Sequence, residues 1–157
     1  MEPTGGLPRW AEKDQIAWVE WQVAEAIDAE NGACRLLVGK SLGTLACGSA
    51  AERSLPAVWL TPLLTSSHVV DSLRRTTAPT LLVGGSADDM WDPQIADSLP
   101  HAVHEVPAAD HALELPGDVA GSIDVLQRVM SRLDQFLGEI PTPPSQGRLK
   151  AYPSDKT

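Results

Sequence analysis

The sequence predicts an α/β fold with a parallel sheet of about four strands, flanked by helices. Two observations support this prediction. Short apolar runs alternate along the chain with longer stretches of helical spacing or polar composition. The apolar runs are also continuous rather than alternating with polar residues, which is typical of strands buried on both faces of a parallel sheet.

The elements follow one another within a single domain, since 157 residues suffice for one hydrophobic core. We expect this domain to span residues 1–138, with a flexible arm at 1–13 and a proline-rich flexible tail at 139–157. Asp14 is the expected N-cap of the first helix. Strands are expected at residues 36–38, 57–61, 80–85 and 103–106, and helices at 14–29, 44–51, 67–75, 93–99 and 119–137.

The segment Gly39-Lys40-Ser41-Leu42-Gly43 follows the first expected strand and has the form of a nucleophile elbow. In such an elbow a strand turns sharply into a helix, with a serine at the apex. A serine on so tight a turn takes strained backbone angles, and glycines two residues before and after it remove Cβ atoms that would collide. We therefore interpret Ser41 as a catalytic nucleophile.

Two further strand ends carry reactive side chains. Asp88 or Asp89 follows the third strand, and His111 follows the fourth. Ligands of open parallel sheets bind at the carboxyl ends of the strands. A serine hydroxyl needs an imidazole to accept its proton, and the imidazole needs a carboxylate to orient it. The order Ser, Asp, His fits this kind of elbow, and the Leu42 amide is the expected oxyanion donor.

The stretch from residue 36 to 137 resembles the C-terminal half of an α/β-hydrolase, so the expected sheet is a truncated α/β-hydrolase-like one. In that family the acid lies three residues after a glycine that closes its strand, with a proline a few residues on. Gly85 and Pro93 bracket Asp88 in this way, so Asp88 is the preferred acid and Asp89 the alternative. The resemblance implies hydrolysis of an ester, thioester or related acyl bond in a small molecule, without a metal or an organic cofactor. It is carried by the elbow and by residues 82–88 and 109–111.

The chain departs from the family pattern before the elbow. Three or four strands and a glycine-containing loop, which supplies the second oxyanion donor, normally precede the elbow strand. Only an arm and one helix precede it here. Loss of one donor costs about 3 kcal/mol of transition-state stabilisation. The unpaired elbow strand is expected to favour self-association. The alternative function is therefore a non-catalytic or weakly active hydrolase remnant that interacts through this edge.

The charge and composition of the chain exclude some classes of binding partner. The net charge of −9 argues against binding of nucleic acid through phosphate contacts and against an anionic membrane surface. The first thirty residues lack a signal-peptide pattern and no apolar run has transmembrane length, so we expect a cytoplasmic protein. Lys40, Pro62 and Trp91 lie next to the expected site and are candidates for lining a substrate pocket.

Overall fold

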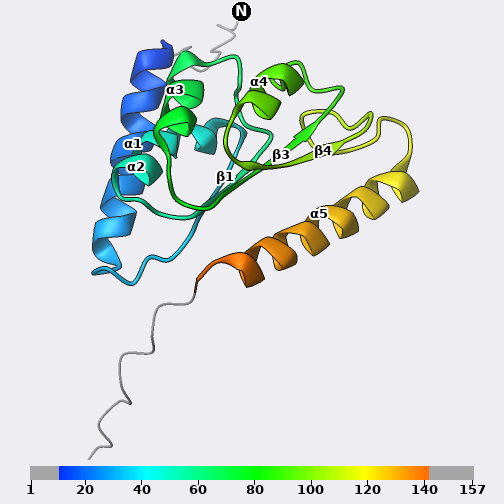
Figure 1. The fold of residues 1–157 in the computed structure, drawn as a ribbon. Coiled ribbons are helices and arrows are strands. Elements are labelled where there is room, and N and C mark those ends of the chain that lie inside the picture. The colour runs from blue at the N-terminus through cyan, green and yellow to red at the C-terminus, as the bar shows by residue number, and fades with distance from the viewer. Residues whose placement is uncertain (1–10, 142–157) are drawn as a thin grey trace, which may run out of the picture.

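The computed structural model describes residues 11–141 (Figure 1). Its centre is a sheet of four parallel strands that lie in chain order. Each strand pairs with the next one along the sequence, in continuous register. The predicted fold class is confirmed. The strands are β1 (Leu37–Lys40), β2 (Ala57–Leu60), β3 (Thr80–Gly85) and β4 (Ala102–Val106).

Helices cover the two faces of the sheet unequally. Four of them share one face, and α5 lies alone on the other (Figure 1). Neighbouring residues of each buried strand divide between these faces because side chains alternate along a strand. Trp59 and Leu82 pack on the four-helix side, whereas Val58 and Leu81 pack under α5. The helices are α1 (Glu12–Ala29), α2 (Cys47–Glu52), α3 (Ser67–Arg75), α4 (Pro93–Ser98) and α5 (Val119–Glu139).

Within residues 11–141, β1 and β4 are the two edge strands of the sheet. Among the described residues β1 is paired with β2 alone, and the Val38 side chain on it is 57% exposed. α5 buries Val125, Val129 and Phe136 against the sheet. A second apolar stripe of α5 stays exposed, and its members are Val119, Ile123, Leu126, Met130 and Leu137.

Some boundaries differ from those predicted. α1 begins at Glu12 with Ala11 as its N-cap, so Asp14 lies in the first turn and is not the cap. The segment after β1 is not a single α-helix over residues 44–51, because a 3₁₀ helix, η1 (Ser41–Ala46), comes before α2. Residues 1–10 and 142–157, which make up most of the predicted arm and tail, lie outside the described residues. Within residues 11–141, no helix has the length and apolar character that a membrane crossing requires.

Candidate active site

Ser41 is the first residue of η1, directly after β1, and its backbone is strained. Its φ of 50° lies in the left-handed region, which non-glycine residues rarely adopt. Gly39 makes this turn possible, because a Cβ there would lie 2.6 Å from Cζ3 of Trp59 and 2.9 Å from the Gly43 carbonyl oxygen. The expectation for Gly43 is wrong: a Cβ at that position would meet open space. The close approach that requires glycine therefore exists only before the serine.

Thr44 stabilises the elbow through two hydrogen bonds of its hydroxyl group. Its fully buried side chain donates from Oγ1 to the Ser41 carbonyl at 2.7 Å. The same oxygen accepts the backbone N–H of Leu63 at 3.3 Å, which ties the elbow to the loop after β2. Sequence reasoning missed this residue because a threonine in a predicted helix carries no signal of such a bond.

Asp88 is held in a turn directly after β3. Its Oδ1 accepts the Met90 N–H at 2.8 Å, and its carbonyl accepts the Trp91 N–H at 3.0 Å. The Trp91 indole lies on the end of β3, where a Cβ on Gly84 would fall 2.0 Å from a ring carbon. The Trp91 Nε1–H donates to Glu105 Oε2 at 2.7 Å. Trp91 thus secures the acid turn against β3 and β4.

The loop that carries His111 is joined to the acid loop by backbone bonds. Ala87 N–H donates to the Ala109 carbonyl at 3.0 Å, and Ala108 N–H donates to Ser86 Oγ at 2.8 Å. Gly85 permits this approach, since a Cβ there would lie 2.1 Å from the Ala109 carbonyl oxygen. Gly84 and Gly85 end β3 as consecutive glycines. This pair is the signal in the sequence for two close contacts, that of Gly84 with the Trp91 ring and that of Gly85 with the loop that carries His111.

The three predicted side chains meet at the carboxyl ends of the strands. Ser41 Oγ lies 2.7 Å from His111 Nε2, and His111 Nδ1 lies 2.8 Å from Asp88 Oδ2. The Asp88 side chain is 1% exposed and that of His111 is 41% exposed. The structure brings Asp88 to the imidazole, whereas the alternative, Asp89, is exposed. This arrangement allows the imidazole to accept a proton from the serine while a buried carboxylate holds its other nitrogen.

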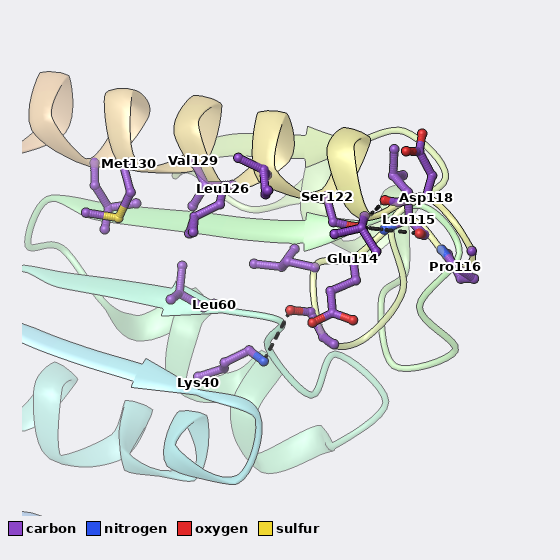
Figure 2. Close-up of a pocket in the computed structure, with 16 residues that line it drawn as sticks. Lys40, Leu60, Glu114, Leu115, Pro116, Asp118, Ser122, Leu126, Val129 and Met130 are labelled. Atoms are coloured by element: carbon purple, nitrogen blue, oxygen red, sulfur yellow. Dashed lines mark hydrogen bonds between the residues drawn. The ribbon is translucent and has the colours of Figure 1, made fainter.

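These side chains line one hollow, and a second cavity lies under α5. The hollow has a volume of about 480 Å³, opens over Ser41 and His111 and includes Asp89 and Asp110 in its wall. The second cavity has a volume of about 540 Å³ and is lined by other residues (Figure 2). Lys40 lines the second cavity, and its Nζ donates to the Ala112 carbonyl at 3.5 Å.

The other two pocket candidates are placed differently. Pro62 and Trp91 are both buried and line neither of these cavities. The structure assigns Trp91 the packing role described above. Leu42 is the second residue of η1, where helix N–H groups lack partners within the helix. Its predicted role as oxyanion donor stays a prediction.

Two ionisable groups outside the site have shifted pKa values. Burial raises the pKa of the Cys47 thiol, and the nearby Glu20 carboxylate adds to this effect. Burial also lowers the pKa of His104, with further contributions from Arg132 and Arg128. Among residues 11–141, no three His, Cys, Asp or Glu side chains gather as metal ligands would.

Solved structures with the same fold are α/β serine hydrolases. An α/β serine hydrolase homologue from Coxiella burnetii superimposes with a TM-score of 0.60 at 15% identity, covering 83% of this chain and 64% of that one. A predicted CIB-like hydrolase from Thermoplasma acidophilum gives a TM-score of 0.59 at 13% identity, covering 79% and 62%. An α/β serine hydrolase without a lid from Xanthomonas campestris gives 0.54 at 19%, covering 78% and 56%.

These likenesses define the class of fold: the chain has an α/β-hydrolase-like fold, as the sequence predicted. It spans 56–64% of the length of these three hydrolases. Comparison with protein-family models finds no match, and comparison with curated proteins finds none either.

Proposed function

We propose that this protein is a serine hydrolase that cleaves an ester, thioester or related acyl bond. The observation that carries the proposal is the chain of short contacts from Ser41 Oγ through the His111 ring to Asp88 Oδ2. The left-handed conformation of Ser41 supports it, because an elbow exposes the serine oxygen at the rim of the sheet. The structurally similar hydrolases lend support to the reaction class.

The proposed reaction assigns a part to each of these residues. Ser41 Oγ attacks the acyl carbon while His111 Nε2 accepts the hydroxyl proton. The Leu42 N–H stabilises the oxyanion that forms. The imidazolium then gives its proton to the leaving alcohol or thiol, which departs and leaves an acyl-serine. Water attacks this ester with His111 again as the base, so that the carboxylic acid is released and Ser41 is restored.

The buried Asp88 carboxylate fixes the tautomer and the orientation of the His111 imidazole. Asp88 Oδ2 accepts the Nδ1–H of His111, which leaves Nε2 free to act as the base toward Ser41. The second oxygen, Oδ1, is occupied by the Met90 N–H, so the carboxylate cannot rotate without losing a bond. Asp88 therefore orients the ring and stabilises the positive charge that it acquires.

Fluorophosphonate labelling and hydrolysis of p-nitrophenyl acetate test the proposal. Ser41→Ala should abolish both, and Asp88→Asn should lower kcat by up to about 10⁴-fold because it favours the wrong tautomer of the imidazole. Asp89→Asn is the matched control, since Asp89 is a neighbouring exposed carboxylate, and it should retain activity. Equal labelling of the wild type and Ser41→Ala would contradict the proposal.

A second candidate function is an interaction module that uses the β1 edge. One side of β1 has no strand partner within residues 11–141, and Val38 is exposed; both favour this function, because a free strand edge is a template for pairing with another chain. It is tested by the association state of the protein in solution.

A further inference from the structure

We infer that the cavity beneath α5 binds the acyl chain of the substrate, and that the preferred substrates are esters of linear fatty acids. The inference rests on the proposed function, whose residues it extends with a binding site. The cavity has a volume of about 540 Å³, within the range of small-molecule sites. It lies between one side of α5 and the ends of β1 and β2 (Figure 2).

Two residues that line the cavity are chain neighbours of the proposed catalytic residues. Lys40 directly precedes Ser41, and Ala112 directly follows His111. The Lys40 Nζ and the Ala112 carbonyl oxygen are 3.5 Å apart, a long and exposed contact at the wall of this cavity. A flexible lysine side chain can leave this position at little cost. An acyl group attached to Ser41 Oγ could then extend from the hollow over the serine into the cavity.

The chemistry of the lining changes along the cavity. The polar groups lie at the end near the site, on Lys40 and on the loop that includes Glu114 and Asp118. Farther along α5 the walls are aliphatic, formed by Leu60, Val129 and their neighbours (Figure 2). None of the sixteen described residues that line the cavity is aromatic. Such a lining matches a ligand with a polar carboxyl end and an aliphatic tail.

The exposed stripe of α5 supplies the far wall. Ile123, Leu126 and Met130 all line the cavity, although these residues are 54%, 59% and 55% exposed. Apolar side chains left in water on a concave surface gain most from an aliphatic ligand. The eleven residues from Ile123 to Leu133 extend about 15 Å along the helix axis, which suits a long chain.

The experiment compares p-nitrophenyl acetate, butyrate, octanoate and laurate as substrates. For the wild type, kcat/KM should rise about twofold to fourfold for each added methylene as the chain fills the cavity. Leu126→Gln should lower the laurate-to-acetate ratio of kcat/KM by at least about tenfold, because it places an amide in the aliphatic wall. Since Leu126 is exposed, this change removes no core contact.

Trp21→Gln is the matched control, because Trp21 is a similarly exposed apolar residue on α1, across the sheet. It should leave the ratio unchanged. Binding of laurate to the Ser41→Ala protein, measured by calorimetry, provides a readout that does not require activity. It should be lost in the Ser41→Ala, Leu126→Gln double variant.

The outcomes separate the two proposals. Activity that is independent of chain length, with no binding of laurate, would overturn the acyl site and leave the hydrolase intact. Laurate binding without Ser41-dependent hydrolysis would overturn the proposed function and retain a fatty-acid site. A dimer that Leu126→Gln converts to a monomer, with unaltered chain-length preference, would identify a second copy as the occupant and overturn the acyl site.

Discussion

Ser41 adopts its strained conformation because the residues around it leave no alternative. A left-handed φ costs a non-glycine residue about 1 kcal/mol or more. The Thr44 hydroxyl holds the Ser41 carbonyl, and the Trp59 ring presses against Gly39. The strain is therefore sustained by buried groups of η1 and β2, and the serine oxygen faces His111 as a result.

Substitution of the two elbow glycines tests this account. Gly39→Ala places a methyl group 2.6 Å from the Trp59 ring and should lower the free energy of unfolding by about 1–3 kcal/mol. Gly43→Ala meets open space and should be neutral, or should stabilise by up to about 1 kcal/mol. Urea unfolding of both variants measures the difference. Equal destabilisation by both would show that the Trp59 contact does not determine the requirement for glycine.

At the scale of elements, α5 shows how far the sequence could predict the structure. The apolar spacing over residues 119–137 predicted the helix, and the helix is present. The same spacing could not tell which stripe meets the sheet. Val125, Val129 and Phe136 are buried, whereas Ile123, Leu126 and Met130 stay exposed. A helix with two apolar stripes has no unique orientation until the strands beneath it are placed.

The contact between α5 and β4 predicts a dependence of stability on pH. Burial, Arg132 and Arg128 lower the pKa of His104, so the folded protein takes up this proton less readily than the unfolded chain, whose pKa is about 6.5. The free energy of unfolding should therefore be highest above pH 6.5 and should fall as the pH drops below it.

Chemical denaturation at pH 7.5 and pH 5.5 measures this contribution. His104→Gln should lose less stability than the wild type between the two values, because it removes the group that must be charged against α5. An identical loss in both proteins would show that His104 does not contribute.

At the scale of the whole molecule, the site could be predicted because parallel strands bring their carboxyl ends to one rim. That rule places residues that follow β1, β3 and β4 close together, and the structure does so with Ser41, Asp88 and His111. The supporting contacts could not be predicted. The Trp91–Glu105 bond depends on how side chains of separate elements pack, which periodicity and motifs do not specify.

The open edge of the sheet predicts association in solution. Val38 is exposed on β1, and the other side of this strand has no partner among the described residues. We expect wild-type protein to self-associate at high concentration, and Val38→Lys to reduce this because an edge lysine opposes strand pairing. Light scattering over a concentration series measures the association state of both proteins. A monomer at all concentrations in the wild type would contradict the expectation.

The order of the strands has a consequence for how the protein assembles. Every pairing in the sheet joins segments about twenty residues apart, so each closes a short loop at small entropic cost. The acid and the imidazole follow β3 and β4, which share the longest register. Ser41 follows β1, whose register with β2 is one residue pair shorter than that of β4 with β3. The contact between Asp88 and His111 can therefore form before Ser41 joins it, and fraying of β1 would separate Ser41 from His111 first.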